Sequence, residues 1–183
     1  MDSSPTVPTE GSLKKRRDIL RTACCQCLDQ CLEVVQELPE EAYRREQSTG
    51  SSIGTHMRHI IERISCVLEG LTVGRVDYDR RDRNITLEIS PDAATLALRG
   101  IQRTLLILDV DSGASLEVAE SVHAESPVVA VPSSLDRELM SLVSHTVHHL
   151  AIISLLSTSA GYPLAIEIGK APSTLLYERN RPQ

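Results

Sequence analysis

The sequence contains no tryptophan and no phenylalanine, and four tyrosines are its only aromatic side chains apart from histidine. Because 41% of the residues are nevertheless hydrophobic, the core has to be built from aliphatic side chains, alanine and cysteine. Aliphatic helices packed on one another fit that inventory. A chain of 183 residues has the length of one ordinary domain, so we expect a single helical domain.

Positive charge is also scarce, because the formal net charge is −6. A negative chain repels phosphate backbones, and few aromatic side chains are present for base stacking, so we expect no nucleic-acid partner. No stretch approaches the roughly 18 uninterrupted apolar residues of a membrane span, and the first residues lack the charged-then-apolar order of a signal peptide. We therefore expect no membrane association and a cytoplasmic location.

The five cysteines are an odd number and do not resemble a secreted disulfide framework. The CxxC spacing of Cys24 and Cys27 invites a zinc or redox interpretation. These two residues and Cys31 nevertheless fall on the apolar stripe of one predicted helix, and a second CxxC is missing. We interpret the three as small core residues, and Cys25, off the stripe, as an exposed thiol.

Apolar periodicity and capping residues predict four helices in a domain of residues 13–183, preceded by a disordered tail of residues 1–12 that is rich in Ser, Thr and Pro. The first helix spans residues 13–38 and stops at Pro39. The second starts near Ser52, the third starts at Ser90 and reaches about residue 108, and the fourth starts at Ser133 or Ser134 and runs to residue 161.

Three segments fall outside these helices. Residues 72–84 are too charged for a core and predict a long crossover loop, and the alternation within residues 115–131 predicts at most a short β-hairpin. The last residues, from 161 to 183, have no regular pattern. Their apolar side chains imply that they pack against the body of the domain.

Five of the six histidines fall in two of the predicted helices. On a helical wheel at about 100° per residue, His145 and His149 lie one turn apart on the flank of the apolar stripe, on the same strip as Glu138. His148 points further away. Two imidazoles at i and i+4 can bind one transition metal, but such pairs also arise by chance, so a metal site needs a further ligand.

The second helix offers that ligand in SIGTHMRHIIER, where His56 and His59 lie one turn apart beside the apolar face. If the two helices are neighbours, one of these imidazoles completes a site of three histidines. The wheel places His56 nearer the core than His59. The alternative is that all of them are satisfied polar groups at the edge of a core, and we expect His123, in the predicted hairpin, on the surface.

Four segments of the chain resemble, in order, the signature blocks of the DinB-like (DinB/YfiT) helical metalloproteins. They are SSIGTHMRHIIE, VDYDRRDRNITLEIS, SSLDRELMSLVSHTVHHLAII and IGKAPSTLLY. The resemblance is to a subgroup with an HxRH helix, an HxxHH helix and an APST segment. It implies an all-α fold, a four-helix bundle in which one histidine of the second helix and two of the last bind a divalent metal. On this sequence these ligands are His59, His145 and His149. The residues that would serve as alternate ligands or orient the ligands are His56, His148 and Glu138.

Better-understood relatives use the metal in thiol chemistry, so the resemblance implies a metal-dependent thiol S-transferase or a hydrolase acting on a small molecule. We expect zinc or nickel, with iron or copper also compatible with imidazole ligands, and a low-molecular-weight thiol as a second cofactor. The charged loop from Asp77 to Arg81 would line the pocket and bind an anionic substrate group, through Asp77, Tyr78 and Arg80. Alternatively, this loop is a salt-bridged crossover. The sequence predicts no particular catalytic residue.

A second hypothesis is a non-enzymatic helical-bundle module whose metal is structural or absent. The last helix is hydrophobic almost all round, which is typical of a buried or interface-forming element. We therefore expect a homodimer under either hypothesis.

Overall fold

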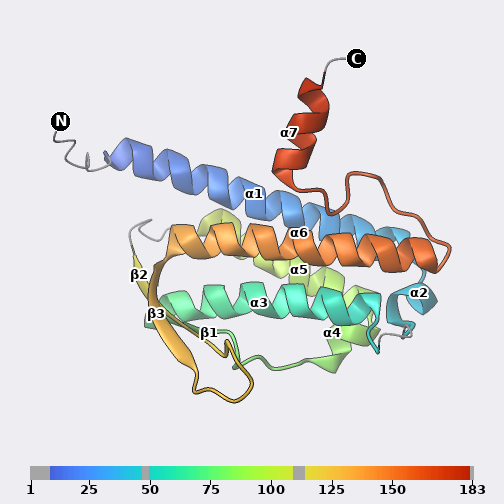
Figure 1. Cartoon of the computed structure of the whole chain (residues 1–183), viewed down its shortest axis with the longest axis horizontal. Coiled ribbons are helices and arrows are strands. Elements are labelled where there is room, and N and C mark those ends of the chain that lie inside the picture. Colours follow the sequence, from blue (N-terminus) through green and yellow to red (C-terminus); the bar gives the residue numbers. More distant parts are fainter. Residues whose placement is uncertain (1–8, 47–49, 109–113, 182–183) are drawn as a thin grey trace.

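The computed structural model describes residues 9–46, 50–108 and 114–181. Within these residues the chain forms seven helices and three strands (Figure 1). In chain order they are α1 Glu10–Glu37, α2 Glu40–Arg44, α3 Ile53–Val73, β1 Arg75–Asp77, α4 Ile85–Ile89, α5 Pro91–Ile107, β2 Ser115–Glu120, β3 Val129–Ser134, α6 Leu135–Ser159 and α7 Pro172–Asn180. The protein is mostly helical, as expected, and has a small sheet in addition.

The four long helices α1, α3, α5 and α6 enclose the core. α1 and α3 each pack against both α5 and α6, and Figure 1 shows α1 and α6 running in one direction and α3 and α5 in the other. A side-chain N-cap marks where each of them begins, and three of these caps were predicted. Ser52 and Thr55 form a capping box at α3, Ser90 caps α5 ahead of Pro91, and Ser134 caps α6. The predicted starts of the second, third and fourth helices are thereby confirmed.

A three-stranded sheet lies at the end of the helices where α3 finishes and α6 begins (Figure 1). β2 pairs antiparallel with β3, which confirms the predicted hairpin, whereas β1 adds a parallel edge strand inside the segment that was expected to be a loop. β1 can fold back against α3 because Gly70 has no side chain: a Cβ there would lie 2.6 Å from the Arg75 carbonyl oxygen. The sheet therefore ties the end of α3 to the start of α6.

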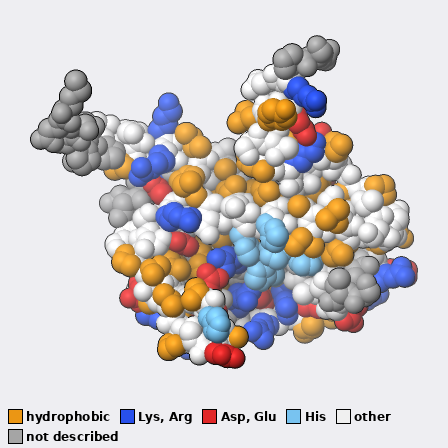
Figure 2. All heavy atoms as spheres, in the orientation of Figure 1, with side chains coloured by type: hydrophobic (Ala, Val, Ile, Leu, Met, Phe, Trp, Pro, Cys, Tyr) orange, Lys and Arg blue, Asp and Glu red, His pale blue; other side chains and the backbone are white. Residues whose placement is uncertain are grey.

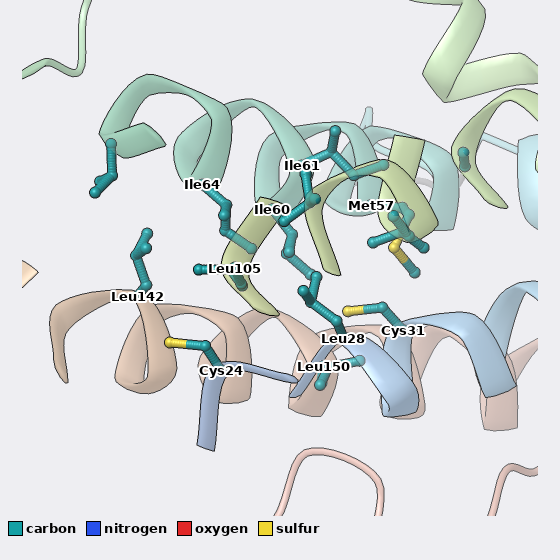
Figure 3. Close-up of a cluster of buried hydrophobic side chains, with 14 of the residues drawn as sticks. Cys24, Leu28, Cys31, Met57, Ile60, Ile61, Ile64, Leu105, Leu142 and Leu150 are labelled. Atoms are coloured by element: carbon teal, nitrogen blue, oxygen red, sulfur yellow. The ribbon is translucent and has the colours of Figure 1, made fainter. Parts of the chain in front are cut away.

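The core between the long helices is aliphatic, as the composition required (Figure 3). Leu28, Ile60 and Leu150, from three different helices, are fully buried. Tyr43 is fully buried as well, and its hydroxyl donates to the Leu87 carbonyl oxygen at 2.6 Å.

The buried face of α1 includes Cys24, Cys27 and Cys31, called here the α1 thiols. Burial raises the pKa of Cys24 to about 12 and that of Cys27 to about 11. These thiols are therefore protonated core groups, as predicted. Cys25 is half-buried, less exposed than expected.

The two ends of the domain differ from expectation. α1 already begins at Glu10, with Thr9 as its N-cap, so the prediction of a disordered tail is wrong for residues 10–12; residues 1–8 lie outside the described residues. The last segment contains α7, which starts at Pro172 and projects from the body in Figure 1. Of the apolar residues in this segment, Ile168 is buried in the core, but Leu176 is exposed.

Among the described helices, α6 alone has the length and mean hydropathy of a membrane span, with a mean hydropathy of 1.5. Its apolar stripe, including Leu139, Leu142 and Leu150, is buried in the core, and the helix packs against α1 and α3. The core helix of a globular domain meets the same two criteria.

Candidate metal centre

Four histidines meet where α3 and α6 pack side by side. His56 and His59 lie one turn apart on α3, and His145 and His149 lie one turn apart on α6. All four side chains are partly exposed, and Figure 2 shows histidine side chains gathered in one surface patch with basic side chains below it. The expectation that the two histidine-bearing helices are neighbours is therefore confirmed.

Three of these imidazoles form the tightest group. His59, His145 and His149 each present one ring nitrogen, and the three nitrogens lie within 4.8 Å of one another. His59 Nε2 and His145 Nε2 are 2.8 Å apart, and the ring centroids of His59 and His149 are 4.6 Å apart. His56 lies at the edge of the group, where its Nδ1 is 3.0 Å from His149 Nδ1. The structure thus brings His59, the α3 ligand that the resemblance implied, together with His145 and His149 on α6.

The surroundings keep these rings uncharged. Burial, together with neighbouring cations and imidazoles, lowers the pKa of His59 to about 4 and the pKa values of His145 and His149 to about 3. Burial is the largest cause for each ring, and the foremost neighbouring charge is Arg81 for His59 and Arg63 for His145. Near pH 7 each ring is neutral and has a nitrogen lone pair, which is the form that binds a metal.

The three residues fit a divalent transition metal. A Zn–N bond of about 2.0–2.1 Å places two ligand nitrogens of a tetrahedral site roughly 3.3 Å apart. Nitrogens within 4.8 Å of one another can reach one cation by small side-chain rotations. Three imidazoles leave a coordination position for water or a substrate atom, as in catalytic zinc sites.

An arginine contacts this group directly. The Arg81 guanidinium, from the loop after β1, bonds to His59 Nδ1. A guanidinium can only donate, so His59 Nδ1 accepts, and the proton of this ring lies on Nε2, the nitrogen that faces His145. The loop therefore determines the tautomer of one member of the site.

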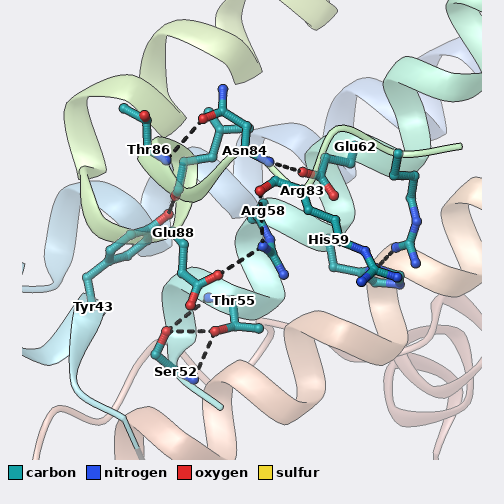
Figure 4. Close-up of polar contacts among 12 residues, drawn as sticks. Tyr43, Ser52, Thr55, Arg58, His59, Glu62, Arg83, Asn84, Thr86 and Glu88 are labelled. Atoms are coloured by element: carbon teal, nitrogen blue, oxygen red, sulfur yellow. Dashed lines mark hydrogen bonds and ion pairs between the residues drawn. The ribbon is translucent and has the colours of Figure 1, made fainter.

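A cavity of about 340 Å³ opens beside His59 and His149, and the residues that complete its lining are Thr55, His56, Arg58, Glu62, Arg81 and Arg83. Figure 4 shows how the chain around α4 is fixed against α3: Arg58 pairs with Glu88 at 3.2 Å, and Glu62 accepts from the backbone N–H of Asn84 at 2.7 Å. The two parts of the cavity wall that α3 and the loop before α4 supply are thus held together by a hydrogen bond and an ion pair, and His149 of α6 completes the wall.

Glu138 was expected to orient the His145 ring, but the structure gives it other partners. Its buried carboxylate accepts from the Tyr78 hydroxyl at 2.5 Å and from the Ser133 hydroxyl, so both of its oxygens are occupied. Arg63 lies 3.7 Å above the Tyr78 ring and pairs with Glu120 at 2.8 Å. This network joins the sheet to α3 and α6.

The residues expected to bind substrate lie away from the cavity. Tyr78 is 3% exposed and belongs to the network of Glu138, Asp77 is on β1, and Arg80 is exposed. Arg81 does line the pocket, as expected for that loop, and Arg58 and Arg83, which the sequence did not single out, line it too. Arg58 could have been noticed because it directly precedes His59, whereas a loop position such as Arg83 gives no periodic signal.

The remaining histidines are peripheral. His148 is exposed, and its ring centroid is 5.3 Å from that of His149. His123 is exposed, as expected. His148 therefore lies beside His149 on α6 but is not one of the three histidines whose nitrogens come together.

The GKAPST segment, whose role the sequence left open, docks on α6 beside the site. Gly169 lies directly against the backbone of Leu150 and Ala151, next to His149 in the chain, and its N–H donates to Gln30 Oε1 at 3.1 Å. Its φ of 74° lies in the left-handed region that favours glycine. The segment thus packs against the turn of α6 that positions His149.

No family model matches the chain, and no solved structure matches it. Among curated proteins the chain is similar to FK506-binding protein 5 of Rhizopus delemar, with 33% identity over 105 residues. The match covers 55% of this chain and 26% of that protein. The chain therefore spans about a quarter of the length of this curated relative.

Proposed function

We propose that this protein is a DinB-like four-helix bundle that binds one divalent metal through His59, His145 and His149. The observation that supports it best is the grouping of three neutral imidazole nitrogens within 4.8 Å, from two helices far apart in sequence. The arrangement of α1, α3, α5 and α6 around one core agrees with a bundle. Zinc or nickel is the proposed metal, and iron or copper is compatible with the same ligands.

We also propose that the site acts on a small molecule, as a thiol S-transferase or a hydrolase. A divalent cation in such a site lowers the pKa of a bound water or thiol and makes it a nucleophile near neutral pH. The cavity is lined by His59 and His149, so it gives a small molecule access to two of the three proposed ligands. The identity to an FK506-binding protein covers too little of that protein to suggest the same ligand here.

Metal content tests the proposal. Protein purified without an affinity tag is incubated with zinc or nickel, desalted and analysed for metals, as wild type and as His145→Ala/His149→Ala. About one equivalent in the wild type, lost in the variant, is expected from a three-imidazole site. The matched control is His123→Ala/His148→Ala, which removes two exposed imidazoles and should keep the metal. A folded wild type without metal, or equal content in both double variants, would refute the assignment.

A second candidate is a non-enzymatic module that forms a homodimer. Large apolar side chains are exposed at the C-terminal part of α6 and beyond it: Leu155 is 70% exposed, Ile166 73% and Tyr177 67%. Such residues favour a protein contact there. Light scattering during gel filtration tests this, because the dimer should dissociate in Leu155→Ser/Tyr177→Ser and persist after loss of the metal ligands.

A further inference from the structure

The cavity beside His59 is lined by more positive than negative side chains. Arginines 58, 81 and 83 line it together with one carboxylate, that of Glu62. Glu62 accepts from Asn84, and Arg58 is paired with Glu88. Within the part of the chain that the structure describes, neither Arg81 nor Arg83 has a carboxylate partner. Two guanidinium charges at this cavity are therefore uncompensated.

Arg81 also has an unused donor. Its Nε–H is buried without an acceptor in the described structure, and its terminal nitrogen bonds to an imidazole rather than to an acid. A buried donor without an acceptor is energetically unfavourable, and such groups are rare in folded proteins unless a water, an ion or a ligand supplies the acceptor. Arg83, the neighbouring arginine, has a φ of 50° and is the one residue other than glycine with a positive φ among those described. Such conformations cluster at ligand-binding sites.

The proton on His59 gives an independent argument. A metal-bound imidazole nearly always donates its second N–H to a carboxylate, a carbonyl or water. Here the atom facing His59 Nδ1 belongs to Arg81, which can only donate. If His59 binds a metal through Nε2, its proton moves to Nδ1, and two donors face each other. An acceptor that displaces this direct contact would satisfy both donors.

We propose that this cavity binds an oxyanion, the carboxylate or phosphate group of a small molecule, which replaces the direct contact between the Arg81 guanidinium and His59 Nδ1 and accepts from both, with Arg83 also lining the cavity. A planar guanidinium suits two oxygens of such a group. The inference rests on the proposed metal site, since the anion accepts a hydrogen bond from the N–H group that metal binding leaves at Nδ1. The bound anion also offsets the positive charge that the metal adds among three arginines. The substrate class is therefore a small anionic molecule whose reacting atom lies next to its oxyanion.

Isothermal titration calorimetry tests this, because the chain has no tryptophan to report binding by fluorescence. Succinate and, separately, inorganic phosphate are titrated into metal-free and nickel-loaded protein, as wild type, Arg81→Gln and Arg80→Gln. Arg80 is the matched control, since it is the adjacent arginine, is exposed and does not line the cavity. We expect Arg81→Gln to weaken binding about tenfold or more, the scale of a lost charged hydrogen-bonding partner, and Arg80→Gln to match the wild type.

The outcomes separate the two proposals. Binding of either probe that depends on Arg81 supports the oxyanion site, and the probe that binds more tightly tells carboxylate from phosphate. Equal binding by wild type and Arg81→Gln, or no binding of either probe, overturns it. Nickel content of the same samples tests the metal site separately, because Arg81→Gln keeps all three imidazoles and should keep its nickel. Melting temperatures show that each variant is folded.

Discussion

Replacing Gly169 with alanine should destabilise the protein by loosening the segment that docks on α6 beside His149. A Cβ at this position would lie 2.6 Å from both the Leu150 carbonyl carbon and the Ala151 Cα. Carbon atoms in favourable contact are about 3.5–4.0 Å apart. The obstacle is helix backbone, so the segment rather than a side chain has to move.

Two terms set the size of the effect. Overpacking a well-packed site costs about 1–3 kcal/mol, and a left-handed conformation costs a residue with a Cβ roughly 1–2 kcal/mol. Gly161 separates them, because its φ is 90° but a Cβ there would meet nothing within 4 Å. Gly161→Ala should therefore cost only the second term. The loss of unfolded-state entropy is the same in both variants, so their difference of about 1–3 kcal/mol isolates the packing against α6.

Thermal unfolding followed by circular dichroism measures this difference. For a chain of this size 1 kcal/mol corresponds to about 2–4 °C in Tm, so Gly169→Ala should melt about 2–12 °C below Gly161→Ala. Equal melting temperatures for the two variants would refute the packing argument. A third variant, Gly100→Ala, should not be destabilised, because Gly100 is in a helix with free space around it and alanine is the better helix former.

Three further outcomes are expected. Tyr78→Phe removes one donor from the buried Glu138 carboxylate and should lower the free energy of unfolding in urea by about 1.5–3 kcal/mol. The metal content should not change. Unchanged stability would contradict a structural role for this hydrogen bond. In metal-free protein, the three site histidines have folded pKa values of about 3 and 4, below their unfolded value of 6.5. Because the unfolded chain binds more protons in this window, stability should fall as pH drops from 6.5 toward 4. Tm should fall less steeply with pH in His145→Ala/His149→Ala than in the wild type. Parallel plots of Tm against pH for the two proteins would refute this. The α1 thiols should resist alkylation at pH 8 until the protein is unfolded, which peptide mass mapping detects, since burial raises their pKa values; rapid labelling of all three would show that α1 is not part of the core.

The sequence by itself determined the features that depend on near neighbours in the chain. Ser52, Ser90 and Ser134 mark helix starts because an N-cap hydrogen-bonds to a backbone N–H three residues ahead. The i, i+4 spacing of His145 and His149 follows from helix geometry alone. The same periodicity placed the α1 thiols in the core, because a chain without Phe or Trp has to fill its interior with smaller groups.

Other features depended on which elements meet. That His59 rather than His56 lies closest to the pair on α6 depends on how α3 is rotated against α6, a property of packing that a wheel drawn for one helix does not contain. Arg81 reaches the site while Arg80 points to solvent. Which of these two adjacent arginines faces the site is decided by the path of the loop after β1, and the three residues of β1 themselves show no recognisable strand pattern in the sequence.

The C-terminal segment contains one feature that the sequence predicts and one that it does not. Pro172 at the first position of α7 is the same signal as Pro91 at the start of α5, so this helix was open to prediction from its sequence. The close approach of Gly169 to α6 was not, because a glycine in sequence does not reveal which backbone will lie against it. Hydrogen bonds and periodicity within an element are written in the local sequence. Contacts between elements exist only once the aliphatic core has fixed their rotation and register, and those contacts decided which imidazoles and which arginine share one site.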